Sequence, residues 1–150
     1  MKKIHSLIAF TLVFVCMIQS VNAGTEASSE IRTSQPYKSI VMAGDAELIL
    51  NPSDKLEISV EGTQDQIMNM HTVIKNDTLY ITQINNKDKR QQRTRVVVSV
   101  DGLNTLYVKG KTDVSANGVI NTDILTIRAE EGAVVNLDMR ASKSKGKVQG

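Results

Sequence analysis

The stretch Ile40-Val41-Met42-Ala43-Gly44-Asp45-Ala46-Glu47-Leu48-Ile49-Leu50 decides the fold class of this chain. Apolar or small side chains occupy every second position from Ile40 to Leu50, which is the period of a β-strand with one buried face. A turn at residues 51–54 (Asn-Pro-Ser-Asp) and a second alternating run at 56–60 follow. The pattern predicts a strand, a turn and a second strand.

Alternation returns further along the chain. Residues 73–75 and 79–81 flank Asn76-Asp77, a pair that tolerates tight-turn geometry, and predict a hairpin. Residues 96–100 again carry Val at every second position. Residues 64–70 break the alternation with helix-like spacing, and we expect a short connector there that caps an open end of the core. No segment has the pattern of a convincing amphipathic helix.

The second half of the chain is repetitive. Leu106-Tyr107-Val108-Lys109-Gly110 is echoed 19 residues later by Leu125-Thr126-Ile127-Arg128-Ala129. Short strands with small-residue turns at a period near 20 predict an all-β stack of coils, a β-helix or solenoid. A β-sandwich stays open as the alternative, because two copies do not establish a repeat. The scarcity of aromatic residues favours narrow coils filled by Val, Ile and Leu.

Residues 1–23 have the three parts of a secretory signal peptide. A basic start precedes an apolar run over 6–20, and Val-Asn-Ala at the end predicts cleavage after Ala23. The run is shorter than the roughly 20 residues of a spanning helix, so we expect no integral membrane protein after cleavage. The predicted location is the periplasm, the outer-membrane surface or the extracellular space. Residues 24–36 are small and polar, and predict a flexible lead-in to a β domain over 37–142.

Cleavage changes the composition that bears on function. It removes Cys16, the only cysteine, so we expect no disulfide in the exported chain. It also removes Lys2 and Lys3, which leaves the remaining Lys and Arg balanced against the 16 Asp and Glu. A nucleic-acid binder needs a basic field to neutralise phosphates, so we expect no nucleic-acid partner.

The order of these motifs resembles a known family. The strands at 40–44 and 56–62, the hairpin at 76–81, the valine strand at 96–100 and the repeat from 106 are similar to the GIN domain, also called the putative auto-transporter adhesin head domain (DUF2807). The resemblance implies a right-handed β-helix-like fold in exported proteins, mainly of Bacteroidota, and it transfers no catalytic residue. Family members continue through further coils, so we expect residues 143–150 to be a polar tail or the start of a further coil.

The residues after the leader offer little for catalysis. His71 is the one histidine left and no cysteine accompanies it, whereas zinc needs three or four ligands and nucleophilic catalysis needs a nucleophile beside a base. We therefore expect no catalytic, metal or cofactor site, and no enzyme. Glycoside cleavage would need two carboxylates in a cleft. Asp45 with Glu47, or Asp113 with Asp123 if the coils stack, are such pairs, and we expect them to be solvated outer-face acids.

Two features are candidate sites. The first is the basic run over residues 87–95, the most localised cluster of charge in the sequence, which we expect to meet an anionic glycan or lipid head group. Its cations are Lys87, Lys89, Arg90, Arg93 and Arg95. Asp77-Thr78-Leu79 resembles the acceptor site of O-glycosylation in Bacteroidota, which makes Thr78 a candidate for modification.

The expected function is that of an exported, non-enzymatic binding or structural module of the cell envelope, resembling an adhesin. Its expected partners are an envelope glycan or protein, or a second copy that associates through an exposed coil end. Two alternatives stay open. One is an enzyme that acts on polysaccharide from a β-helix scaffold. The other is a periplasmic carrier of a lipid or outer-membrane component, which would need an open rather than a filled coil interior.

Overall fold

The computed structural model describes residues 27–84 and 93–149, which form two six-stranded sheets and a short helix. In chain order the elements are β1 (Ser28–Thr33), β2 (Ser39–Ala43), β3 (Ala46–Pro52), β4 (Glu57–Gly62), α1 (Gln64–Asn69), β5 (Met70–Lys75), β6 (Thr78–Gln83), β7 (Thr94–Val100), β8 (Thr105–Lys109), β9 (Asp113–Ala116), β10 (Ile120–Glu130), β11 (Val134–Val135) and β12 (Met139–Gln149). The predicted all-β class is confirmed, since α1 spans fewer than two turns.

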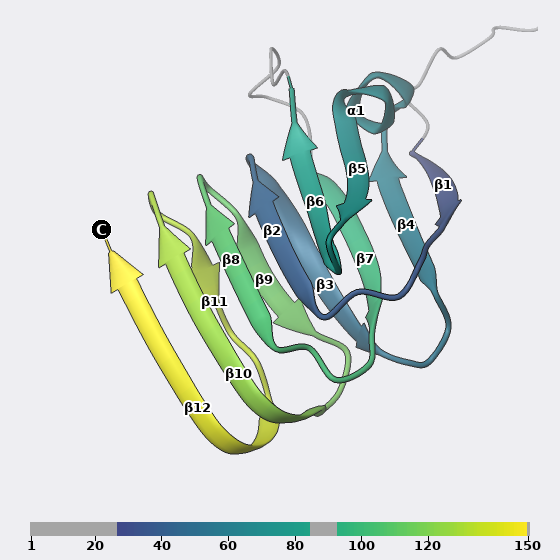
Figure 1. The fold of residues 1–150 in the computed structure, drawn as a ribbon. Helices are drawn as coiled ribbons and strands as arrows, with labels where there is room; N and C mark the ends of the chain where they lie inside the picture. The colour runs from purple at the N-terminus through teal and green to yellow at the C-terminus, as the bar shows by residue number, and fades with distance from the viewer. Residues whose placement is uncertain (1–26, 85–92, 150) are drawn as a thin grey trace, which may run out of the picture.

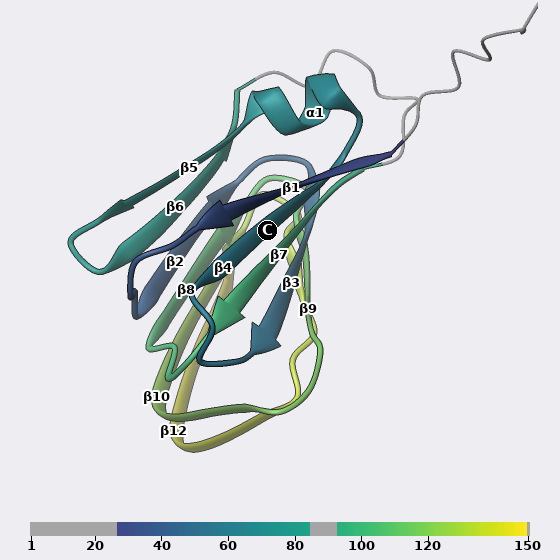
Figure 2. The ribbon, with the colours of Figure 1, turned by 90° about the vertical axis from the view of Figure 1, so that its right-hand side faces the viewer.

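The two sheets lie face to face (Figures 1 and 2). Sheet A has the strand order β1-β4-β7-β3-β9-β11, and sheet B has the order β12-β10-β8-β2-β6-β5. The chain passes from sheet B to sheet A and back, so that β2 leads to β3, β6 to β7, β8 to β9 and β10 to β11. These strands pair in parallel with one another, whereas β1, β4 and β5 pair antiparallel. Both sheets are therefore mixed, and neither is closed.

The stretch that decides the fold is two strands rather than one. Residues 40–50 turn a corner at Gly44-Asp45, which places β2 in sheet B and β3 in sheet A. The corner is tied to the next pair of strands, because the backbone N–H of Gly44 donates to Lys109 O at 3.3 Å and the buried Thr112 hydroxyl donates to Gly44 O at 3.1 Å. Periodicity alone missed this corner because alternation continues across it.

The register of the repeat also differs from the sequence comparison. Leu106 of β8 lies opposite Ile127 of β10, and Val108 lies opposite Ala129. The stacked residues are therefore 21 positions apart, two more than the apparent sequence repeat. Leu125, the sequence counterpart of Leu106, is nevertheless buried.

The core fills the space between the sheets with aliphatic side chains from both inner faces. Its largest fully buried members are Ile40, Met42, Leu48, Leu50, Ile67, Met70, Leu79, Ile81, Leu103, Leu106, Ile120 and Leu125. Burying one such side chain contributes roughly 1.5–3 kcal/mol, so this packing is the main stabilising term. The interior is thus occupied by the protein's own side chains.

One end of the core is closed by α1 and the hairpin β5–β6. Thr63 caps α1 in a capping box with Gln66, and the buried Ile67 packs into the core. The predicted hairpin turn is confirmed, because Asn76 and Asp77 both adopt positive φ, at 50° and 54°.

Two segment predictions need correction. The predicted flexible lead-in includes residues 28–33, but these form β1, which pairs antiparallel with β4. Arg32 anchors β1 by donating to Met70 O at 2.6 Å and Ile67 O at 3.1 Å. Residues 143–150 were expected to be either a polar tail or the start of a further coil. The polar tail is wrong for residues 143–149, because these residues continue β12, which pairs in parallel with β10. The leader 1–23, with Ala23, lies outside the described residues, and no helix in the described part has the length and apolarity to cross a bilayer.

Candidate functional site

The predicted anionic-ligand loop divides into two groups of cations. Lys87, Lys89 and Arg90 lie outside the described residues. Arg93 and Arg95 are described, and both are engaged by the protein itself. Carboxylates from neighbouring strands of sheet A surround their side chains.

Arg93 lies just before β7 and reaches the beginnings of β3 and β9. Its guanidinium lies 2.9 Å from Asp45 Oδ1 and 2.5 Å from Asp113 Oδ2, and it donates to Ala46 O at 3.0 Å. It also donates to Lys111 O. A guanidinium with this many acceptors holds the corner together and is not free for a ligand.

Arg95 makes a similar cross-link two residues further along the chain. Its guanidinium lies 3.2 Å from Glu47 Oε2 of β3 and 3.5 Å from Glu61 Oε2 of β4. Such half-exposed pairs contribute little each, about 0–1 kcal/mol, but they neutralise the cation where it stands. Arg93 and Arg95 therefore tie strands of sheet A to one another.

The carboxylate pairs considered for glycoside cleavage are also explained by this arrangement. Asp45, Glu47 and Asp113 each face an arginine on sheet A. Asp113 and Asp123 do not share a face, because β9 belongs to sheet A and Asp123 lies in β10 of sheet B. The pairing of these two acids that was considered for glycoside cleavage does not form, because the chain changes sheets between them.

The outer face of sheet B carries a row of large side chains across its strands. Register places one residue of each strand in this row, in the order Val73, Tyr80, Val41, Tyr107, Arg128 and Lys147. Val73 and Tyr80 are exposed, and Tyr107 is half-buried. Adjacent strands lie about 4.8 Å apart, so the two tyrosines, with β2 between them, are about 10 Å apart.

The same face is strongly basic among the described residues. Away from the corner where β10 and β12 begin, which carries the exposed Asp123 and Arg140, its outward cations are Lys75, Lys109, Arg128, Lys143, Lys145 and Lys147, and its outward carboxylate is that of Glu130. We call these residues, together with the row of large side chains, the basic face. The outer face of sheet A has the opposite character. Its outward carboxylates are those of Glu47, Glu57, Glu61 and Asp113, against the one outward cation Arg95 in the described strands.

The single carboxylate of the basic face is itself neutralised. Glu130 accepts a hydrogen bond from the Tyr107 hydroxyl at 2.7 Å, and Arg128 Nη2 lies 2.5 Å from its Oε1. The hydrogen bond from Tyr107 is the main reason that the pKa of Glu130 is lowered, and it raises the pKa of Tyr107 in turn. The Arg128 guanidinium lies 5.3 Å from the centre of the Tyr107 ring, a cation–π geometry.

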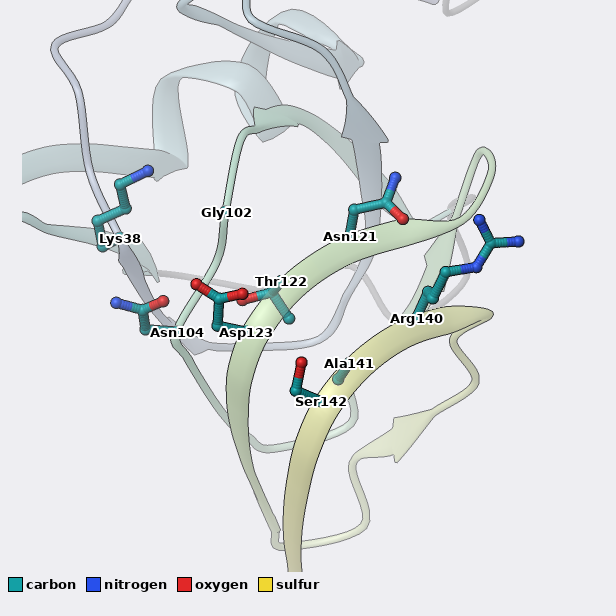
Figure 3. A pocket seen from close by; sticks show the side chains of 9 residues that line it. All are labelled: Lys38, Gly102, Asn104, Asn121, Thr122, Asp123, Arg140, Ala141 and Ser142. Atoms are coloured by element: carbon teal, nitrogen blue, oxygen red, sulfur yellow. The ribbon is translucent and has the colours of Figure 1, made fainter.

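A separate pocket of about 650 Å³ lies where the chain turns into strands of sheet B (Figure 3). We call it the corner pocket. Its lining comes from the segment before β2, the segment before β8, the start of β10 and the start of β12. The lining residues are Lys38, Gly102, Asn104, Asn121, Thr122, Asp123, Arg140, Ala141 and Ser142. Along β10 the buried residues Ile120 and Leu125 are five positions apart, so the alternation of buried and exposed residues is interrupted between them. The strand bends around the pocket at this point.

The remaining candidates have simple structural roles. Thr78 is half-buried at the start of β6, and its hydroxyl donates to Asn76 O at 3.2 Å. His71 is exposed on β5 opposite Thr82. Within residues 27–84 and 93–149, no group of three or more His, Cys, Asp or Glu side chains could hold a metal ion. Sequence reasoning missed the basic face and the corner pocket, because both are assembled from segments far apart in the chain.

Comparison with known proteins finds one family and several solved structures that share this fold. The model of the family described as "Putative auto-transporter adhesin, head GIN domain" matches residues 36–150. A "putative adhesin" from Parabacteroides distasonis superposes with a TM-score of 0.73 at 18% identity, covering 85% of this chain and 55% of its own. A "putative adhesin" from Parabacteroides merdae gives 0.65 at 16% identity, covering 83% and 57%.

A third solved structure carries a different description. A "putative lipid binding protein" from Parabacteroides distasonis superposes with a TM-score of 0.61 at 13% identity, covering 83% of this chain and 63% of its own. At these identities the likeness establishes the fold alone. The chain spans less than two thirds of the length of these solved chains. A search of the curated proteins gives no match.

Proposed function

The chain belongs to the family of putative auto-transporter adhesins with a head GIN domain, and on that premise we propose that it is an exported, non-enzymatic binding module of the cell envelope. The resemblance drawn from the strand and glycine pattern is confirmed by this membership. The proposed ligand is an anionic envelope polymer, and the proposed contact surface is the basic face of sheet B.

The segregation of charge between the two sheets carries this proposal. The exported chain is nearly neutral as a whole, yet its strands place lysines on one outer face and carboxylates on the other. Lys143, Lys145 and Lys147 follow one another along β12 at about 6.7 Å spacing, set by two residues of an extended strand. The successive charges of a linear polyanion can pair with these lysines. Tyr80 and Tyr107, in the row of large side chains, offer ring surfaces on the same face.

The proposed architecture supports this use. We propose that the two sheets are the walls of a right-handed β-solenoid, in which each passage from sheet B to sheet A and back is one coil. Parallel connections within one sheet are right-handed in about 98% of cases, which favours this hand. A stack of coils presents flat, rigid faces, so the side chains of the basic face are held in place before a ligand arrives.

The filled interior and the paired carboxylates favour ligand binding on the outer face of the protein over the two alternative functions, a lipid carrier and a polysaccharide-cleaving enzyme. A lipid carrier needs an open interior, whereas the space between the sheets is filled by packed aliphatic side chains such as Leu48, Leu79 and Leu106. A polysaccharide-cleaving enzyme needs a free carboxylate pair, whereas Asp45 and Glu47 are each held by an arginine.

A pair of matched variants tests the proposal. Lys145→Glu with Lys147→Glu changes two charges on the basic face. Lys55→Glu with Lys111→Glu makes the same change in net charge at exposed residues outside that face. Binding to immobilised polygalacturonate is measured at low and at physiological salt, with neutral dextran as the control polymer. We expect the first variant to lose about tenfold or more in affinity, and the second to bind as the parent does.

The outcomes that would overturn the proposal are distinct. Equal losses in both variants would mean that only net charge matters, and retention by the first variant would mean that the basic face is not the site. The double variant Lys89→Glu with Arg90→Glu tests separately the sequence-based prediction that residues 87–95 contact the polymer. Release of reducing ends from the polymer would show an enzyme. Binding to anionic phospholipid vesicles but not to the polymer would point to a membrane instead.

A further inference from the structure

The corner pocket gathers polar side chains that the fold itself does not use. Within the described residues, the side chains of Asn104, Asn121, Asp123, Arg140 and Ser142 make no hydrogen bond or ion pair to protein atoms. Lys38 differs only slightly, since its ammonium donates to Asp101 O at 2.7 Å. Thr122 shows the contrast, because its hydroxyl donates to Leu103 O at 2.8 Å and so braces the wall.

The pocket is built from segments that successive coils bring together. Lys38 precedes β2, Asn104 precedes β8, Asn121 and Asp123 lie on β10, and Arg140 lies on β12. The walls are fixed by backbone hydrogen bonds between these segments: Asn104 N donates to Lys38 O at 2.7 Å, and Thr126 N donates to Asn104 O at 2.9 Å. The polar groups are therefore held at defined separations by the backbone.

Gly102 keeps the space beside the lysine open. Its φ is +65°, and a Cβ built there would lie 3.1 Å from Lys38 Nζ. A larger residue would press on the ammonium and move it. Gly102 thus allows the turn, and its lack of a side chain leaves space for a ligand next to Lys38.

The distribution of groups defines the chemistry of a ligand. Figure 3 shows Lys38 and Asn104 on one side, Asn121 and Arg140 on the other, and Asp123 between them. Two cations against one carboxylate leave the pocket net positive, which suits a ligand with one negative charge. Several ligand hydroxyl groups can be satisfied here, because the Asp123 carboxylate accepts hydrogen bonds and the asparagine amides both accept and donate them.

We propose that the corner pocket binds one acidic sugar residue, a hexuronate, with its carboxylate on Lys38 or Arg140 and its ring hydroxyls on Asp123 and the two asparagines. A volume of about 650 Å³ is in the range of small-molecule sites and holds a monosaccharide with room for a linked neighbour. The polar lining selects a polyhydroxylated ligand over an apolar one. This site shares no residue with the basic face, so either proposal can fail without the other.

Titration by NMR of the full exported chain tests this site. The probe is galacturonate, with glucose as the neutral sugar and inorganic phosphate as the bare anion. We expect galacturonate to shift the side-chain amide signals of Asn104 and Asn121, and glucose to bind more weakly. Lys38→Gln and Arg140→Gln are compared, and the variant that lacks the partner of the carboxylate should bind galacturonate about tenfold more weakly, the loss typical of a charge-assisted hydrogen bond. Asp123→Asn should weaken both sugars and leave phosphate unaffected or bound more tightly.

Matched controls separate the pocket from general charge effects. Lys145→Gln removes one positive charge from the basic face, and Asp54→Asn removes one carboxylate from an exposed turn. Both should bind galacturonate as the parent does, and thermal unfolding verifies that every variant is folded. Equal affinity for glucose, binding of phosphate with no response to galacturonate, or unchanged galacturonate binding in both the Lys38→Gln and the Arg140→Gln variant would each overturn the proposal.

Discussion

Substituting Gly110 tests whether the backbone after β8 lies as close to the corner at Gly44 as the structure shows. Gly110 follows β8 with φ +82°, and a Cβ added there would overlap the carbonyl oxygen of Gly44, at the corner between β2 and β3. That carbonyl accepts from the Thr112 hydroxyl, so it cannot move without breaking a buried hydrogen bond. Gly110→Ala must therefore displace backbone at the corner.

The expected magnitude has two contributions. A non-glycine residue in the left-handed region costs roughly 1–2 kcal/mol, and forcing an extra methyl into a packed site costs about 1–3 kcal/mol more. Gly110→Ala should therefore lower the free energy of unfolding by about 2–5 kcal/mol. Gly132 is the matched control, because it lies in the turn after β10 with φ +87° and nothing within 4 Å of its added Cβ. Gly132→Ala carries only the first cost.

Urea denaturation followed by far-UV circular dichroism measures both variants. Because the unfolded-state effect of Gly→Ala is the same at the two sites, it cancels in the comparison. We expect Gly110→Ala to be the less stable by about 1–3 kcal/mol, with an unchanged slope m. Equal stabilities would refute the reasoning, since they would mean that the backbone at Gly110 is not in contact with the backbone at Gly44.

Three further predictions concern the core and the charged corner. Leu106→Ala should cost about 2–5 kcal/mol because Leu106 is fully buried, whereas Ile124→Ala, at a half-exposed side chain, should change stability by no more than about 0.5 kcal/mol in urea melts. Burial raises the pKa of Tyr37 to about 12. Ionisation of this tyrosine should therefore not affect stability below about pH 10, and should lower it by roughly 2–3 kcal/mol between pH 10 and 12. The Tyr37→Phe variant should lack this loss, and parallel curves of unfolding free energy against pH for the two proteins would contradict the prediction. Arg93→Gln should destabilise by about 1–3 kcal/mol at pH 7, because it removes the hydrogen bonds and ion pairs of the guanidinium; an unchanged melting temperature would argue against the cross-link.

Local pattern was sufficient for the strands but not for their partners. The period-two runs identified strand residues around 40–50, 56–60, 79–81 and 96–100, because burying one face of a strand requires alternation whatever lies opposite. The first of these runs nevertheless forms two strands, β2 and β3, and the pattern did not show the corner between them. The turn at Asn76 was equally readable, since few residues tolerate its positive φ. Pattern failed at β1, whose polar sequence is ordered by pairing with β4 and by the hydrogen bonds of Arg32.

The loop of basic residues shows why a candidate site cannot be taken from a charge run alone. Sequence grouped Arg93 and Arg95 with the lysines before them. In the structure Asp45, Glu47 and Asp113, distant in the chain, come within reach of the two arginines on sheet A, whereas Lys87, Lys89 and Arg90 lie outside the described residues. A cation's availability depends on which carboxylates the fold brings beside it.

The sequence by itself determined that this is an all-β chain with the strand and glycine pattern of its family, because those signals depend on neighbours a few residues apart. Only the tertiary structure decided which side chains share a face. Parallel stacking brings residues about 20 or more positions apart into contact, and their register sorts a nearly neutral chain into a basic face, an acidic face and a polar corner pocket. Binding depends on that arrangement in space, and the linear order of the residues does not contain it in readable form.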